Sequence, residues 1–188
     1  TLACRDIRET CDLFLPVFER TKGEHGFVSL EVPPGLAHET EATIEEAQRL
    51  FHEVKRPNLM VKVPATPEGI PAIRTLIGNG VNINITLIFS VSQYRAVADA
   101  YLNGLRDAQK KRRDLSRVHS VASVFVSRID TLVDKRFAAM TPSASDPARK
   151  NEMESLQGKA AVANSKIIYQ EFKKIFFSIA RSKTGRRR

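Results

Sequence analysis

Four short stretches of the chain alternate apolar and polar residues, and the stretches between them carry apolar residues at intervals of three and four. Alternation at period 2 predicts a β-strand with one face buried, whereas the longer interval predicts an amphipathic helix. Strands are therefore expected at residues 26–32, 58–63, 81–89 and 119–127.

Helical spacing surrounds each of these strands. Thr66 suits the N-cap of one helix, with Pro67 in its first position, and Ser90 with Gln93 fits a capping box at the start of another. The expected helices cover residues 5–20, 40 or 43 to 54, 67–77, 90–105 and about 130–140, and one long last helix follows the loop TPSASDP.

One helix followed by four strand–helix pairs predicts parallel strands covered by helices. An open doubly wound sheet and a (β/α)8 barrel of the TIM type both have this order. No strand is followed by a G-x-G-x-x-G sequence or a P-loop, which weakens the nucleotide-binding form of the open sheet.

Each predicted strand carries polar residues on one parity, and the alternate residues are mostly apolar. An open sheet meets helices on both faces and needs both to be apolar, whereas a barrel points one face into a central mouth. Active sites of such barrels lie at the carboxyl ends of the strands, so the barrel is favoured and a site is expected there. The alternative is that each residue is a satisfied polar group of the core. The polar-face residues are Ser29 and Glu31, Lys62, Asn82, Asn84 and Thr86, and Ser123, Phe125 and Ser127.

Lys62 is the most informative residue of this set, because burying an unpaired ammonium group costs several kcal/mol or more. Either Lys62 reaches water or a partner, or its neutral amine is wanted. A neutral amine can attack a carbonyl and form a Schiff base, whose iminium accepts electrons during cleavage of a carbon–carbon bond. Glu31 could then deprotonate a water, Asn84 could orient hydroxyl groups and Arg128 could hold a phosphate.

Composition changes this interpretation little. A chain of 188 residues that is 42% hydrophobic is enough for one ordinary domain, and no apolar run is long enough to span a bilayer. The net charge is +9, and five of the basic residues lie in the last eight positions, RSKTGRRR. A second basic cluster, KKRR at 110–113, falls at an expected helix end, where cations are favoured by the helix dipole. No RNP, KH or zinc-finger pattern accompanies these cations, so nucleic acid is not the expected partner. Cys4 and Cys11 are expected to be reduced thiols in the core.

Five segments, taken together, resemble transaldolase, and most closely its long bacterial and plant form. The resemblance covers residues 2–177, and the order and spacing of the motifs are specific. The segments are GFVSLEVPPGLAHETEATIEEAQRL, RPNLMVKVPATPEGIPAI, VNINITLIFSVSQYRAVADAYLNGL, HSVASVFVSRIDTLVDK and GKAAVANSKIIYQEFKKIF.

The resemblance implies roles for residues at matching positions. Lys62 in VKVPAT matches the Schiff-base lysine, and Glu31 in VSLEV matches the glutamate that positions the catalytic water with Thr86 of NITLIFS. Asn84 in the same motif matches an asparagine that contacts the intermediate.

The resemblance also implies which residues contact the substrate. Ser123 and Phe125 in SVFVSR match residues that line it, and Arg128 matches a phosphate-binding arginine. The family transfers a dihydroxyacetone unit between sugar phosphates in the pentose phosphate pathway, with no metal or organic cofactor. The implied location is the cytoplasm, or a plastid if the source is a plant, with no membrane and with a homo-oligomer as a candidate form of the full-length protein.

The resemblance also implies that the chain is an internal piece, with strands 3 to 6 of a partial (β/α)8 barrel in residues 1–177. The strand that carries the family's acid/base aspartate would precede Thr1, so an inactive piece is expected. Residues 178–188 are expected to form a basic tail, non-native or disordered. Two alternatives stay open: another class I Schiff-base sugar-phosphate aldolase, and a non-catalytic basic fragment.

Overall fold

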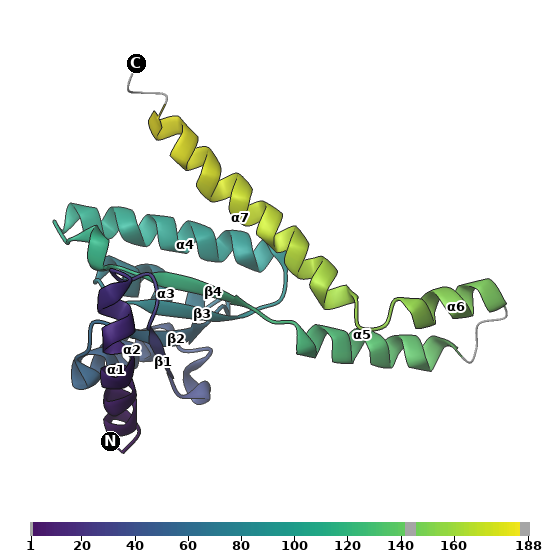
Figure 1. Ribbon diagram of the computed structural model, residues 1–188, viewed down its shortest axis with the longest axis horizontal. Coiled ribbons are helices and arrows are strands. Elements are labelled where there is room, and N and C mark those ends of the chain that lie inside the picture. The colour runs from purple at the N-terminus through teal and green to yellow at the C-terminus, as the bar shows by residue number, and fades with distance from the viewer. Residues whose placement is uncertain (1, 142–145, 185–188) are drawn as a thin grey trace. The chain divides into compact units, whose positions relative to one another are not determined.

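The computed structural model describes residues 2–141 and 146–184, with side chains described up to Phe177. A leading helix is followed by alternating strands and helices (Figure 1). The described strands are β1 Val28–Glu31, β2 Leu59–Pro64, β3 Ile83–Ile88 and β4 Ser120–Val124. The described helices are α1 Leu2–Arg20, α2 Thr40–Val54, α3 Gly69–Gly78, α4 Val91–Lys110, α5 Ser127–Met140, α6 Pro147–Ser155 and α7 Ala160–Thr184, with the short 3-10 turns η1 Pro34–Leu36 and η2 Leu115–Arg117.

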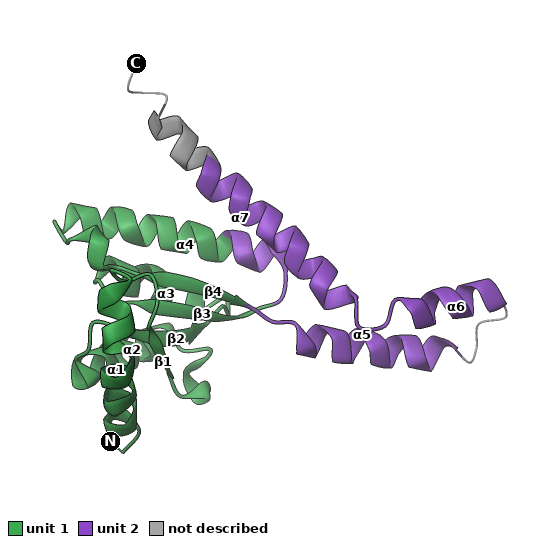
Figure 2. Ribbon diagram, viewed as in Figure 1, with its two compact units in different colours: residues 1–88, 96–123 green, residues 89–95, 124–188 purple. Residues whose placement is uncertain are grey.

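Two compact units divide the chain (Figure 2). The first comprises residues 1–88 and 96–123, and the second comprises residues 89–95 and 124–188. The first unit therefore holds the four strands except Val124. The predicted boundary between a domain of residues 1–177 and a tail of residues 178–188 stays a prediction; α7 runs to Thr184, and residues 185–188 lie outside the described residues.

The first unit is built on one sheet with the strand order β1-β2-β3-β4. β1 pairs with β2 in parallel, β2 pairs with β3 in parallel, and helices α1, α2 and α3 contact these strands. Parallel neighbours need a crossover connection, which the intervening helices supply. The predicted α/β class is confirmed.

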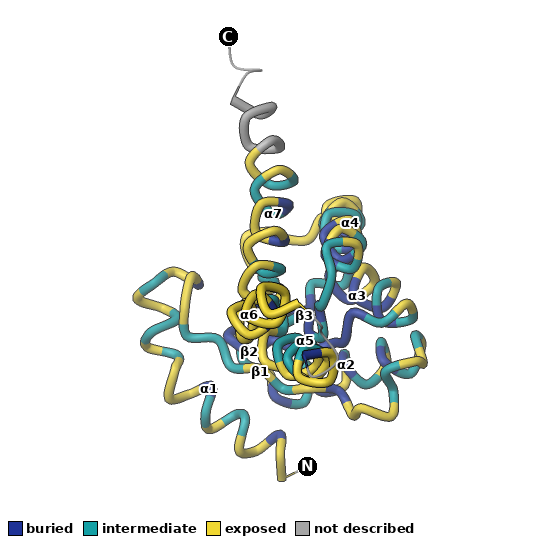
Figure 3. The backbone as a smooth tube through the Cα atoms, turned by 90° about the vertical axis from the view of Figure 1, so that its right-hand side faces the viewer, coloured by how far each residue is buried: buried dark blue, intermediate teal, exposed yellow. Residues whose placement is uncertain are grey.

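The core of the first unit lies between its central strands and its helices. β2 and β3 are mostly buried (Figure 3). β1 and β4 have only half-buried and exposed positions. Fully buried aliphatic side chains contribute about 1.5–3 kcal/mol each, so these strands hold the unit together. The largest of these side chains are those of Leu59, Met60, Ile73, Leu76, Ile77, Ile83, Ile85 and Ile88.

Buried amide side chains tie the amino ends of the strands together. The Nδ2 of Asn58 donates to the carbonyls of Cys11 and Gly26, both at 2.9 Å. The Nδ2 of Asn82 donates to the carbonyls of Pro57 and Leu59 at 3.1 Å, and its Oδ1 accepts from the backbone N–H of His119 at 2.9 Å. Asn82 thereby joins the starts of three strands. Asn82 lies on the polar face that the sequence indicated for this strand, but its hydrogen-bond partners are backbone groups.

Both cysteines are buried in α1 and neither forms a disulfide within the described part of the chain. Burial raises the pKa of the Cys11 thiol to about 11, so that the thiol stays protonated at neutral pH. The prediction of reduced core thiols is confirmed.

Two predictions about the carboxyl half are wrong. The strand expected at 119–127 ends at Val124, and α5 begins at Ser127, because the backbone N–H groups of Ile129 and Asp130 already bond to the carbonyl of Val126. Ser127 therefore lies on a helix and not in the polar row of a strand.

The long last helix is in fact two helices, α6 and α7. Gly158 lies between them with φ +69°, a conformation that glycine adopts readily. Carboxylates of α5 fix this turn: Asp134 accepts from the N–H of Gly158 at 3.0 Å, and Asp130 accepts from that of Ala161 at 2.8 Å. None of the described helices, α7 included, is both long and apolar enough to cross a membrane.

The second unit has one prominent ionic contact. Arg95 lies 2.9 Å from Glu171 of α7, and Lys174 lies 2.7 Å from the same carboxylate. Arg95, and then Lys174, lower the pKa of Glu171 to about 2, so this carboxylate is ionised at neutral pH. The pair attaches the amino end of α4 to α7 within this unit.

Candidate active site

Three of the residues singled out in the sequence lie in one row across the sheet. In the strand register, Glu31 of β1 is opposite Lys62 of β2, and Lys62 is opposite Asn84 of β3. Facing residues of neighbouring strands point to the same side of a sheet. The three residues, which share the polar parity of their strands in the sequence, therefore lie side by side in the sheet, near the carboxyl ends of β1 and β2.

Polar contacts extend this row over all four strands. The Nζ of Lys62 lies 3.3 Å from Oε2 of Glu31. The Oγ of Ser123 in β4 donates to Oδ1 of Asn84 at 2.7 Å, and Nδ2 of Asn84 donates to Oγ of Ser29 at 3.0 Å. Ser29 and Asn84 belong to β1 and β3, so they meet across β2. Side chains from alternate strands form the layers inside a (β/α)8 barrel, and this contact has that character.

The surroundings of Lys62 show how its side chain is accommodated. Its side chain is 27% exposed and its amine reaches a carboxylate, so Lys62 has both water and a partner. Its neighbours Val61 and Val63 are fully buried on the opposite face. The amine is thus held on a rigid, packed strand and is directed towards an accessible polar surface.

Thr86 is the one residue of the expected site that is fully buried. It faces Pro64 in the register, two residues beyond Asn84 along β3. Its Oγ1 is inaccessible to solvent and has no hydrogen-bond partner among the described residues. Buried hydroxyl groups are almost always hydrogen-bonded, so an unpaired one next to a polar row is a place for a bound water or a substrate group.

Phe125 and Arg128 belong to the second unit. The guanidinium of Arg128 lies 5.1 Å from the centroid of the Phe125 ring, and Phe125 also contacts Phe89 at 5.3 Å between centroids. Arg128 is exposed in the first turn of α5, beyond the end of β4. Their meeting with the row of the first unit stays a prediction.

One member of the row was missed by the sequence interpretation as a site residue. Ser29 shares the parity of Glu31, which was noticed, but its contact with Asn84 depends on the curvature of the sheet. Parity alone cannot reveal which side chains meet across an intervening strand. The signal that could have found Ser29 is a barrel interior in which layers come from alternate strands.

The fold and this row define a class: part of an α/β barrel that carries a lysine and a carboxylate at its strand ends. The chain belongs to the transaldolase/fructose-6-phosphate aldolase family, whose model matches residues 1–184. The family prediction and the partial-barrel fold class are confirmed.

Curated relatives agree with this assignment. A transaldolase of Trichodesmium erythraeum is 47% identical over 178 residues, which are 95% of this chain and 47% of the relative. Transaldolases of Thermobifida fusca and Thiobacillus denitrificans are 50% and 49% identical, over 92% and 93% of this chain and 45% and 46% of their own lengths. The chain thus spans about half the length of the curated relatives it matches.

Proposed function

We propose that the protein to which this chain belongs transfers a dihydroxyacetone unit between sugar phosphates in the pentose phosphate pathway, with Lys62 as the Schiff-base residue. The observation that carries this proposal is the register of Glu31, Lys62 and Asn84, which places a lysine, a carboxylate and an amide side by side in a family of transaldolases and aldolases. The proposal makes sugar phosphates, and not nucleic acid, the partners, and places the protein in the cytoplasm.

The proposed reaction begins at the amine of Lys62 and passes through a covalent iminium ion. The amine of Lys62 adds to the ketose carbonyl, and the carbinolamine loses water to give an iminium ion. A base then takes the proton of the C4 hydroxyl, the bond between C3 and C4 breaks, its electron pair moves into the iminium, and an aldose phosphate leaves as an enamine remains on Lys62. The enamine attacks the aldehyde of an acceptor sugar, whose oxygen takes the proton back from the same base. Water finally hydrolyses the new iminium to restore the amine and release the product ketose.

The other residues of the row have roles in this proposal. Glu31, next to the amine, assists loss and addition of water, together with the unpaired hydroxyl of Thr86. Asn84, held by Ser29 and Ser123, presents its amide to hydroxyl groups of the bound sugar. We assign Phe125 to the substrate pocket and Arg128 to its phosphate.

Trapping with borohydride tests the assignment of Lys62. Incubation with fructose 6-phosphate and sodium borohydride is expected to reduce the iminium to a stable secondary amine, which is located by peptide mass spectrometry on Lys62. Lys159 and Lys166 serve as internal controls in the same digest. An adduct on either of them in place of Lys62 would overturn the site assignment.

A parallel incubation without borohydride separates a transferase from an aldolase. With erythrose 4-phosphate present, a transaldolase passes the enamine to the acceptor, whereas an aldolase releases free dihydroxyacetone. Chromatography of the products distinguishes the two outcomes. Trapping at Lys62 with release of dihydroxyacetone alone would keep the Schiff base and reject the transfer.

The hydroxyl of Thr86 allows a further prediction. Thr86→Val keeps the shape and removes an unpaired buried hydroxyl, so the free energy of unfolding is expected to stay unchanged or to increase. If the hydroxyl positions the water, Schiff-base formation at Lys62 is expected to slow by about 10²-fold, the lower range for a proton-transfer group. The measurements are denaturant unfolding and the rate of borohydride trapping. An unchanged trapping rate would leave Thr86 a residue of the core only.

A further inference from the structure

Leu87 adopts a backbone conformation that leucine rarely takes. Its φ is +60°, in the left-handed region, although Leu87 lies inside β3, where extended backbone is expected. This conformation brings Cβ close to the following carbonyl oxygen, so it is costly for residues with a side chain, and glycine is the usual choice there. Strained residues of this kind persist where the surrounding structure holds them, and they cluster at functional sites.

The turn at Leu87 lies where the pairing of the two central strands ends. The register of β2 with β3 ends at the pair of Pro64 and Thr86, one residue before Leu87. The carbonyl of Thr86 still accepts from the N–H of Ala65 at 2.8 Å. The sheet therefore fixes the backbone of Thr86 on one side, and the left-handed conformation of Leu87 fixes it on the other.

The burial pattern of β3 changes at the same place. Ile83 and Ile85 belong to the core and are 2% exposed or less. Strict alternation would place Leu87 with them, but Leu87 is half-buried, and its neighbour Ile88 is fully buried instead. The left-handed residue therefore reverses the parity of the strand, as bulged residues do where they redirect a side chain next to an active site.

Thr86 is the residue of the expected site that this reversal affects most. Its hydroxyl is inaccessible to solvent and has no hydrogen-bond partner among the described residues. A strand that stayed extended would place Ile88 on the same face as Asn84 and Thr86, next in line along β3. With the reversal at Leu87, Thr86 is the last side chain of β3 on the polar face.

We propose that Leu87 is a positioning residue of the candidate active site. Its left-handed backbone holds the Thr86 hydroxyl at the end of the polar face, unpaired within the described protein and oriented to bond to a water or a substrate group. This inference rests on the proposed function, because the hydroxyl has a role only in chemistry at Lys62. Leu87 touches no reacting atom in this assignment and acts through Thr86. A competing explanation is that the turn only lets the chain leave the sheet towards α4.

Two substitutions separate the backbone of Leu87 from its side chain. Asparagine has nearly the size of leucine and tolerates the left-handed region, so Leu87→Asn is expected to keep the turn. Valine is β-branched, and a positive φ is a genuine outlier for such a residue. Leu87→Val is therefore expected to return this part of β3 to extended backbone.

The rate of borohydride trapping at Lys62 with fructose 6-phosphate measures the effect. Leu87→Val is expected to slow trapping by about 10²-fold, the same factor as loss of the Thr86 hydroxyl, whereas Leu87→Asn is expected to keep most of the rate. The double variant Leu87→Val with Thr86→Val is expected to be no slower than Thr86→Val alone. Two substitutions that act through one hydroxyl group do not add.

Lys55 offers a matched control for the backbone conflict. It also has a left-handed backbone, with φ +53°, but it is an exposed residue that ends α2. Lys55→Val is expected to lower the thermal midpoint of unfolding and to leave the rate of trapping unchanged. Equal slowing of trapping in Lys55→Val would show that loss of stability alone explains the effect, and would overturn the role of Leu87.

The remaining outcomes separate the explanations. If the turn only lets the chain leave the sheet, Leu87→Val lowers the thermal midpoint and traps at an unchanged rate, which overturns the positioning role. A double variant much slower than Thr86→Val overturns it as well. Should Leu87→Val fail to fold, slow trapping in Leu87→Asn would assign the effect to the leucine side chain and reject the inference. An adduct on a lysine other than Lys62 in the unsubstituted protein rejects the proposed function itself, before any variant is compared.

Discussion

Replacing Lys62 by alanine is expected to remove every trace of the borohydride-trapped adduct and any dihydroxyacetone transfer that the protein performs. No other described side chain places an amine in the row of Glu31 and Asn84. Without the amine there is no iminium, and the carbon–carbon bond has no electron acceptor. The loss is therefore complete, in contrast to the factor of about 10²–10⁴ typical of an acid or base group.

The fold is expected to survive this substitution. The Lys62 side chain is 27% exposed, and the Glu31 carboxylate that it leaves unpaired is 52% exposed, so water replaces the lost contact. Circular dichroism and denaturant unfolding check this point. Lys166→Ala, at an exposed helical position, is the control and is expected to keep the adduct. Trapping that persists in Lys62→Ala would assign the Schiff base to another lysine.

The row of polar residues could be predicted because strand parity is a local property. Glu31, Lys62 and Asn84 each occupy the polar parity of a strand, and parallel pairing then brings them into one row. The contact between Ser29 and Asn84 could not be predicted in this way, because it depends on how far the sheet curls across β2. The unpaired state of the Thr86 hydroxyl is also a property of packing and not of the local sequence.

The ends of strands and helices are harder to predict from the sequence than the elements themselves. Most strands and helices follow from periodicity, but alternation continues through 119–127 although local helical hydrogen bonds begin at Val126. The break between α6 and α7 depends on Asp130 and Asp134, which reach Gly158 and Ala161 from another helix. No local sequence pattern indicates that carboxylates of α5 will bond to this turn.

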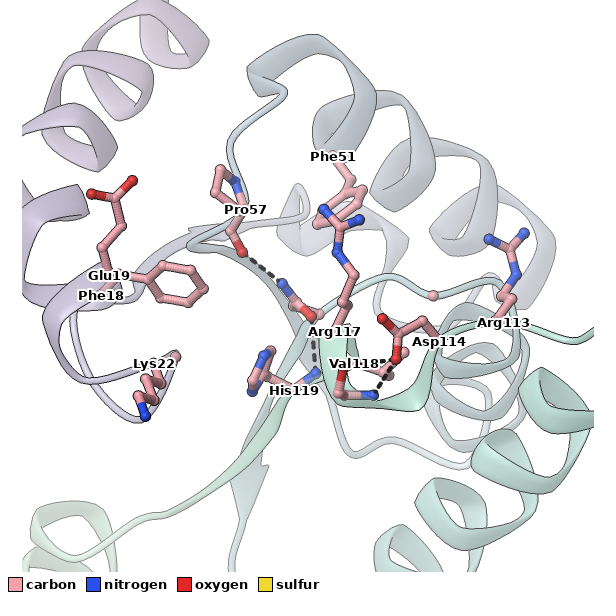
Figure 4. A pocket seen from close by; sticks show the side chains of 14 residues that line it. Phe18, Glu19, Lys22, Phe51, Pro57, Arg113, Asp114, Arg117, Val118 and His119 are labelled. Atoms are coloured by element: carbon pink, nitrogen blue, oxygen red, sulfur yellow. Dashed lines mark hydrogen bonds between the residues drawn. The ribbon is translucent and has the colours of Figure 1, made fainter.

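The run KKRR at 110–113 was interpreted as charges at a helix end, because it follows an amphipathic segment. The structure separates its residues: the amine of Lys111 donates to Oδ1 of Asn79, whereas Arg113 lines a cavity at the amino ends of the strands and Arg112 does not (Figure 4). Connections from distant parts of the sequence form the walls of this cavity, and no motif indicates that they meet.

Replacing Asn82 by alanine is expected to destabilise the first unit more than any exposed substitution. The amide is 2% exposed and serves the carbonyls of Pro57 and Leu59 and the N–H of His119. Each buried backbone group that loses its partner costs about 1–3 kcal/mol. A total of about 3 kcal/mol or more is a large part of a typical stability of about 5–15 kcal/mol. Denaturant unfolding measures the change.

Two further variants make this prediction specific. Asn82→Asp keeps an oxygen acceptor for the N–H of His119 but loses the donor for both carbonyls, so it is expected to remain strongly destabilised. Asn79→Ala removes an amide that bonds only to the exposed amine of Lys111 among the described residues, and it is expected to cost less than about 1 kcal/mol. Equal stabilities of the Asn82 and Asn79 variants would show that the amide of Asn82 does not hold the strand starts together. In that case the β-sheet register that aligns Glu31, Lys62 and Asn84 would depend on the aliphatic core alone.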